Sequence, residues 1–288
     1  MLKDYLARTV RATVTDENDN YVFAQVDGHT FRIAKKELKK VPRPGAVISG
    51  FAYQNEHHQL VMTKQVPKVG RDQYAWGTVV GSHGDLGVFV DIGLPDKDIA
   101  ISSDDLPLLR HLWPQKGSRL LLALTVDDKD RIWGKLATDD LIRQVSVQAD
   151  KRMMNHEVTA TVYRLKRAGT LVLTSDYYLG FIYHGEREQE PYLGQVVQAR
   201  VIDVHADGRL NLSLQPRAYE AISEDAQMIL AALKQNQGHL PYTDKSTPAA
   251  IKAYFGISKG QFKRSVGHLM KAGLVQQREG ELILNEQQ

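Results

Sequence analysis

WGTVVGSHGDLGVFVDIG, residues 76–93, is the stretch that predicts the fold of this chain. Two β-branched runs, Thr78–Val80 and Val88–Val90, flank a bend at Gly84-Asp85, a pattern typical of a β-hairpin. Gly87 has no side chain, so it permits the bulge or sharp bend through which a small sheet closes on itself. We therefore expect a five-stranded barrel around this hairpin.

The order of strands predicted around this hairpin recurs three times along the chain. In each module a glycine (Gly45, Gly117 or Gly194) precedes a long apolar strand, a turn and a short final strand. The glycine lies fifteen or sixteen residues before Leu60, Ile132 or Leu210 of that final strand. A repeated spacing of this kind predicts three tandem barrels rather than one large sheet. We place them at residues 1–67, 68–137 and 157–216.

Residues 138–156 join the second and third modules and are predicted to form a short helical connector. Asp139 and Asp140 are candidate helix caps, and Leu141, Val145 and Ala149 recur at four-residue spacing.

After Pro216 the apolar period changes from two to roughly 3.6, which predicts a helical domain over residues 217–288. Thr247-Pro248 begins the second of three expected helices, and Ser258 caps the third. The expected inward residues of the three helices are Ile222, Ala226, Ile229, Leu230 and Leu233, then Ile251, Tyr254 and Phe255, and finally Phe262, Val266, Leu269 and Met270. A hairpin over residues 274–284 follows, so we expect an α+β winged-helix domain.

The composition argues against several classes of protein. The chain has 288 residues and no Cys, which excludes disulfides, thiolate nucleophiles and Cys-based zinc sites. Because no apolar run reaches the roughly 18 residues of a membrane helix and the start lacks a secretory segment, we expect a cytoplasmic protein without a membrane partner. There is no Gly-Lys-Ser phosphate loop or recognisable triad, and His57-His58 is best explained as a solvated turn, so we predict no enzyme, cofactor or metal.

Two sets of residues carry a resemblance to a known domain. They are Gly77, Val79, Gly87, Phe89, Val90, Gly93 and Gly117 in the second module, and Gly169, Gly180, Phe181, Ile182, Gly194, Val201 and residues 208–213 in the third. Their spacing resembles the RNA-binding domain repeated in ribosomal protein S-one, an OB-fold barrel, and the first module resembles it by strand order. Three such barrels followed by a winged helix resemble the conserved virulence factor B family of bacterial proteins over essentially the whole chain.

This resemblance implies that aromatic residues on the second and third strands, and polar residues at the last turn, contact RNA. It places Phe89 at a stacking position, and Ile101 and Tyr183 at a position usually held by His. Carried over in the same way, the polar turn residues are Asp127, Arg131 and Arg209. The family also implies an influence on virulence-related gene expression.

Alternation and composition add further candidates for the RNA site. Phe89 is expected to face outward because Val88 and Val90 face the other way. Trp133 alternates with Ile132, and packing against a neighbour explains it as well as stacking does. Tyr163, Lys166 and Arg167 combine aromatic and basic side chains, which suits single-stranded RNA, although a solvated loop is the alternative.

The third helix of the winged-helix domain carries a basic outer face. Its candidate contacts are Lys259, Gln261, Lys263, Arg264 and Lys271, with no acidic residue between the first and the last. Such a face suits the phosphates of a nucleic acid duplex, and a protein-docking role is the alternative.

These features predict an RNA-binding protein that acts in post-transcriptional regulation through multivalent contacts with single-stranded RNA. Two other functions fit the same pattern: a DNA-binding transcriptional regulator that uses the winged helix, and a docking adaptor on the ribosome or RNA polymerase. The sequence leaves the RNA target and the oligomeric state open.

Overall fold

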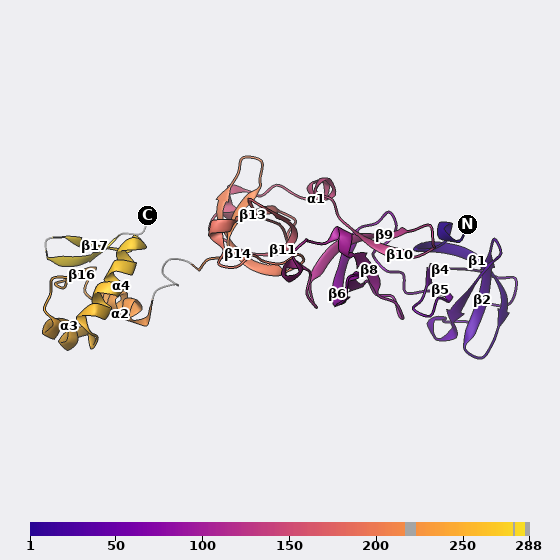
Figure 1. Cartoon of the computed structure of the whole chain (residues 1–288), viewed down its shortest axis with the longest axis horizontal. Coiled ribbons are helices and arrows are strands. Elements are labelled where there is room, and N and C mark those ends of the chain that lie inside the picture. The colour runs from indigo at the N-terminus through magenta and orange to yellow at the C-terminus, as the bar shows by residue number, and fades with distance from the viewer. Residues whose placement is uncertain (217–222, 279, 286–288) are drawn as a thin grey trace. The chain divides into compact units, whose positions relative to one another are not determined.

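The computed structural model describes residues 1–216, 223–278 and 280–285, and it separates into two compact units, Met1–Leu214 and Gln215–Gln288. The first unit contains three closed five-stranded barrels, and the second contains helices and a small sheet (Figure 1). The expected fold class is therefore confirmed. None of the helices among the described residues is long and apolar enough to cross a membrane.

The three barrels share one strand order, in which the fifth strand lies between the third and the fourth. The strands of the first barrel are β1 (Arg8–Glu17), β2 (Tyr21–Val26), β3 (His29–Ala34), β4 (Val47–Gln54) and β5 (Leu60–Thr63). Those of the second are β6 (Ala75–His83), β7 (Gly87–Asp91), β8 (Ile99–Ser102), β9 (Arg119–Val126) and β10 (Ile132–Leu136). Those of the third are β11 (Glu157–Lys166), β12 (Gly169–Thr174), β13 (Leu179–Tyr183), β14 (Val196–Val204) and β15 (Leu210–Ser213).

A bulge in the first strand of every barrel explains the recurring glycine. The register shifts between Val14 and Asp16, between Val79 and Gly81, and between Val162 and Arg164. Gly45, Gly117 and Gly194 have positive φ angles of 84°, 89° and 77°, and each donates its amide to the carbonyl of the valine before the bulge, at 2.8 Å. Because a left-handed backbone favours glycine, this one turn recurs at the spacing seen in the sequence.

Gly87 does not lie at a bulge, because the bulge of this hairpin is at Val80 in the preceding strand. It begins β7 with a φ of 137°, and an added Cβ would clash with the carbonyl oxygen of Ile101. Gly87 therefore permits the close approach of β7 to β8, which is what a tightly curved barrel requires.

The connector contains α1 (Asp139–Val145), which is shorter than the predicted spacing implied. Thr138, rather than Asp139 or Asp140, caps it by accepting a hydrogen bond from the Leu141 amide. Ile142 is its buried residue, while Val145 is exposed and Ala149 lies beyond its end. The four-residue spacing was misleading because the helix completes only two turns.

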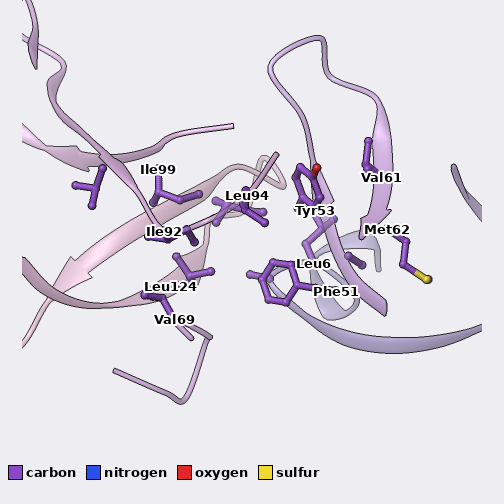
Figure 2. Packing of buried hydrophobic residues seen from close by; sticks show 14 of the residues in the cluster. Leu6, Phe51, Tyr53, Val61, Met62, Val69, Ile92, Leu94, Ile99 and Leu124 are labelled. Atoms are coloured by element: carbon purple, nitrogen blue, oxygen red, sulfur yellow. The ribbon is translucent and has the colours of Figure 1, made fainter. Parts of the chain in front are cut away.

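The first two barrels share one apolar core, part of which Figure 2 shows. Phe51 and Tyr53 of β4 lie on the outside of the first barrel, facing Ile92 and Leu94 from the β7–β8 loop of the second. The third barrel has its own core, and a smaller cluster around Ile142 joins it to the second.

The second unit consists of α2 (Glu224–Gln235), β16 (His239–Leu240), α3 (Pro248–Phe255), α4 (Lys259–Lys271), β17 (Val275–Arg278) and β18 (Glu281–Leu284). The wing has three strands, in the order β16-β18-β17, whereas the sequence predicts only the hairpin of β17 and β18. The sequence does not predict β16, because a strand of two residues shows no alternating pattern. Tyr254 and Met270 were expected to point inward, but they are exposed at the edges of the apolar faces of their helices. Ile222 lies outside the described residues.

Candidate nucleic-acid interface

Each barrel presents one row of residues in register across its outer surface, which we call the outer row. The row begins at the residue after the bulge in the first strand. It continues through the residues paired with it, in turn, on the second, third, fifth and fourth strands of the barrel. Its members are Asp16, Phe23, Arg32, Val61 and Tyr53 in the first barrel; Gly81, Phe89, Ala100, Trp133 and Thr125 in the second; and Arg164, Leu171, Phe181, Asn211 and Asp203 in the third. Because residues in one row point the same way, the three rows can be compared position by position.

The outer row of the second barrel holds two aromatic rings separated by a small residue. Phe89 is half-buried, whereas Val88 and Val90 on either side of it are fully buried inside the barrel. Phe89 pairs with Gly81 and Ala100, and Ala100 pairs in turn with Trp133. The neighbours of Phe89 therefore carry little or no side chain to cover its ring.

Asp127 fixes the ring of Trp133 from the β9–β10 turn. Its Oδ2 accepts hydrogen bonds from Trp133 Nε1 at 3.1 Å and from Arg131 Nε at 2.7 Å, and the Arg131 guanidinium lies 5.3 Å from the centre of the indole ring. Burial acts to raise the pKa of Asp127, but the hydrogen bonds from Arg131 and Trp133 outweigh it and hold that pKa well below its ordinary range. The ionised carboxylate thus orients an indole and an exposed guanidinium beside each other.

The third barrel has a pocket of about 320 Å³ at the same place. Phe181 and Tyr183 line it with rings that meet edge to face, with centroids 4.6 Å apart. His205 and Arg209 close it from the β14–β15 turn, and Arg209 Nε donates to Asp207 Oδ2 at 2.7 Å. Hydrogen bonds from Arg209 lower the pKa of Asp207, so this turn resembles the one that holds Arg131.

Sequence reasoning missed Phe181 and His205 as candidates for this site. Phe181 was noticed as part of the family spacing, and its position between buried Gly180 and Ile182 was the available signal that it faces outward. His205 gave no comparable signal, because a turn residue has no periodicity.

The assignment of Ile101 to the position of Tyr183 is wrong by one residue. Gly87 pairs with Ser102 and Gly169 pairs with Tyr183, so Ser102 is the residue equivalent to Tyr183. Ile101 pairs with Val88 and is completely buried inside the barrel. A shift of one residue in a strand moves a side chain to the opposite face.

Tyr163, Lys166 and Arg167 do not gather at the pocket with Tyr183. Tyr163 is the bulge residue of β11 and packs against the Ile142 cluster between the second and third barrels, where burial raises its pKa to about 12. Lys166 Nζ and Arg164 Nε both bind the carboxylate of Asp139 in α1, each at 3.0 Å. Arg167 is exposed at the β11–β12 turn.

One end of the outer row of the first barrel is covered. Tyr53 is 1% exposed, and its hydroxyl donates to Asp96 Oδ1 of the second barrel at 2.5 Å. Val61 is buried beside it, and Lys97 Nζ donates to the backbone carbonyl of Gln54. The β7–β8 loop of the second barrel therefore occupies the end of the row that the other two barrels leave open.

The winged-helix candidates differ among themselves in exposure. Lys263, Arg264 and Lys271 are exposed on α4, while Lys259 is half-buried. The side chain of Gln261 forms the capping box with Ser258 and also donates to Asp225 of α2 at 3.2 Å. Gln261 thus serves the fold of the domain, and the exposed basic residues make up the available surface.

Among the described residues, no group of three or more His, Asp or Glu side chains could hold a metal ion.

Family models match four segments of the chain. Residues 8–65 match an S1 domain, and residues 74–135 match the CvfB first S1-like domain. Residues 142–216 match the second domain of virulence regulatory factor CvfB, and residues 227–284 match a CvfB-like winged helix domain. The chain is thus a multidomain protein built from S1-like barrels and a winged helix.

Two similar proteins align with most of this chain. The chain is 39% identical to the uncharacterized protein YitL of Bacillus subtilis, over 92% of this chain and 89% of that protein. It is 36% identical to conserved virulence factor B of Staphylococcus epidermidis, over 84% of this chain and 81% of that protein. This chain belongs to the conserved virulence factor B family.

A solved structure from Streptococcus pneumoniae also resembles it. That protein, described as a multidomain protein with nucleic acid binding domains, is 46% identical and aligns with a TM-score of 0.71, over 98% of this chain and 99% of the other.

Proposed function

We propose that this protein binds single-stranded RNA in the cytoplasm and regulates gene expression after transcription. The observation that carries the proposal is the pair of accessible outer rows in the second and third barrels. At each row, aromatic side chains lie beside an exposed arginine from the neighbouring turn, and an ionised aspartate holds that arginine in place. The S1-like domains, and the nucleic acid binding domains of the similar Streptococcus protein, support binding of nucleic acid.

The two rows suit unpaired bases. Phe89 and Trp133 in the second barrel, and Phe181 and Tyr183 in the third, provide stacking surfaces, each worth about 1–3 kcal/mol per base and tolerant of sequence. Arg131 and Arg209 lie beside these rings and can approach the phosphates. A base inside a duplex has no free face for such stacking, which is why we favour a single strand.

Multivalency makes two weak sites effective. The barrels lie in one chain and one compact unit, so binding at one raises the local concentration of the strand at the other. We therefore expect the affinity to increase steeply once the RNA is long enough to span both rows.

Fluorescence anisotropy with a labelled single-stranded RNA, at two salt concentrations and with duplex DNA as competitor, tests the proposal. Phe89→Ala and Phe181→Ala should each weaken binding by about 5- to 150-fold, because each removes one stacking surface. Leu108→Ala is the matched control, since Leu108 is fully exposed and outside both rows. RNA binding that neither aromatic substitution affects would contradict the assignment of the site.

The basic face of α4 favours a second candidate function, binding of duplex nucleic acid. Lys263, Arg264 and Lys271 are exposed on one helix that begins with a capping box. Lys263→Ala with Arg264→Ala should reduce capture of duplex DNA and its dependence on salt, compared with Lys234→Ala on α2. Equal capture by both variants would leave α4 as a protein-docking helix, on the ribosome, on RNA polymerase or elsewhere.

A further inference from the structure

A groove beside the outer row of the second barrel shares only Gly81 with the site described so far. It has a volume of about 430 Å³ and lies between the end of β6 and the β8–β9 loop. Its floor includes Gly81, and its walls include Arg110, His111, Trp113 and Lys116.

Gly81 connects this groove to the stacking surface. It is the first member of the outer row and pairs directly with Phe89. A Cβ added there would meet nothing within 4 Å, so the space above the backbone is open. A strand stacked on Phe89 can therefore continue over Gly81 without meeting a side chain from that position.

The equivalent position carries a side chain in the other two barrels. The third barrel has Arg164, whose guanidinium binds Asp139 and lies against the connector. The first barrel has Asp16, whose carboxylate repels phosphate. Only the second of these three rows therefore has no side chain at this end, and that end leads into a basic groove.

The charge of the groove suits a phosphate backbone. Three of its lining residues, Arg110, His111 and Lys116, carry basic side chains, and none of its lining residues is acidic. Asp85, on the adjacent β6–β7 turn, is paired with Arg110. His111 and Lys116 are both exposed, so they can approach a phosphate directly.

The groove is also held in shape. Arg110 Nη1 donates to the carbonyl of Gly84 at 3.2 Å, and its guanidinium lies 5.0 Å from the centre of the Trp113 ring. Trp113 Nε1 donates to the carbonyl of Pro107 at 2.7 Å. These contacts hold the β8–β9 loop to the β6–β7 turn, so a ligand would meet a preformed channel.

We propose that this groove binds the sugar-phosphate backbone of the nucleotides that continue from the base stacked on Phe89, with Gly81 as the open passage and Lys116 and His111 as the phosphate contacts. The proposal rests on the proposed binding of single-stranded RNA. With this groove, the second barrel has a longer binding path than the third, and the RNA strand passes over β6.

The test compares a short oligouridylate of about 4 nucleotides with a longer one of about 12, using the full chain and fluorescence anisotropy. Gly81→Leu blocks the passage, and Gly185→Leu, which adds the same side chain in open space outside both the groove and the pocket of the third barrel, is its control. His111→Ala with Lys116→Ala removes the phosphate contacts, and Lys39→Ala with Lys40→Ala removes the same number of basic side chains from an exposed part of the first barrel.

We expect Gly81→Leu and the His111/Lys116 variant to weaken binding of the longer strand by about 5- to 10-fold and to flatten its salt dependence, while binding of the short strand stays unchanged. Both controls should bind like the unmodified protein. If Phe89→Ala weakens binding but the groove variants bind the longer strand normally, the groove proposal is wrong and the RNA-binding proposal stands. If the unmodified protein binds neither strand, both proposals fail.

Discussion

The first and third barrels have the same strand order and the same bulge, yet their outer rows differ in exposure. In the third barrel, Phe181 and Asn211 line an open pocket. In the first, Val61 occupies the position of Asn211 and is buried, and Tyr53 occupies the position of exposed Asp203 but is hydrogen-bonded to Asp96. The inward residues preserve the barrel, and the outward residues decide whether it can bind a ligand or packs against its neighbour.

This difference has a simple physical basis. Inward positions must fill a closed barrel, so apolar residues recur there in all three modules. Outward positions are free to vary, and an outer surface that carries Phe51, Val61 and Tyr53 gains more from burial against another barrel than from remaining in water. The first barrel therefore serves to fix the β7–β8 loop of the second.

The largest effect expected from this comparison is on stability. Tyr53→Ala should reduce the free energy of unfolding by about 3–5 kcal/mol, because it leaves a cavity between two barrels and removes the hydroxyl that donates to Asp96 Oδ1. Thr125→Ala, at the equivalent but exposed position of the second barrel, should change it by less than about 0.5 kcal/mol. Urea unfolding followed by circular dichroism measures both, and similar midpoints would show that the first barrel is not held by this contact.

A second prediction compares the three recurring glycines. Gly45→Ala, Gly117→Ala and Gly194→Ala should each cost about 1–2 kcal/mol, because each residue has a left-handed backbone. Gly194→Ala should lower the free energy of unfolding by about 1–3 kcal/mol more than the other two substitutions do. Its Cβ would lie 3.0 Å from the carbonyl oxygen of Arg119 in the second barrel, whereas a Cβ at Gly45 or Gly117 would meet nothing within 4 Å. Thermal unfolding of the three variants checks this order, and equal melting temperatures would contradict it.

A third prediction separates binding rows from packed rows. Phe23→Ala in the first barrel should change RNA affinity by less than about twofold, although Phe23 occupies the same row position as Phe89. Val61 and Tyr53 at one end of its row are buried, so a strand stacked there could not continue past them. Anisotropy alongside Phe89→Ala tests this, and equal losses would mean that the first barrel also binds RNA.

The smallest effect concerns the connector. Asp139→Asn should cost less than about 1 kcal/mol at neutral pH, because its partners Arg164 and Lys166 are substantially exposed. Burial acts to raise the pKa of Asp139, but hydrogen bonds from Lys166 and Arg164 outweigh it and lower that pKa below its ordinary value of 3.8. The ion pairs of Asp139 therefore stabilise the fold above pH 3.8, and this stabilisation is lost as the pH falls through the lowered pKa. Unfolding midpoints of the two proteins should therefore converge in acid, and a gap that persists there would exclude an ionic origin.

Much of the fold could be predicted because its signals are local. The recurring glycines report a backbone turn, and Thr247, Pro248 and Ser258 begin their helices as expected. The predictions failed where the pattern was short or lay at the edge of a face, as with β16, α1, Tyr254 and Met270. A two-residue strand or a two-turn helix contains too few residues to show a period.

The candidate site was only partly predictable from the sequence. Alternation was enough to direct Phe89 outward, but it could not show that Tyr163 packs against α1 or that Gln261 caps its own helix. Those outcomes depend on which other segment lies opposite, and no local pattern contains that information. The one-residue error at Ile101 has the same origin, because the register between strands is set by pairing.

The sequence by itself determined three barrels and a winged helix, because glycine turns, helix caps and apolar periods act over a few residues. The tertiary structure decided which barrel surfaces remain open. Tyr53 and Trp133 both face outward from their barrels, and only packing between barrels buries the first while the second keeps its place beside Arg131. Alternation tells which way a side chain points, and contact between distant segments decides what it meets there.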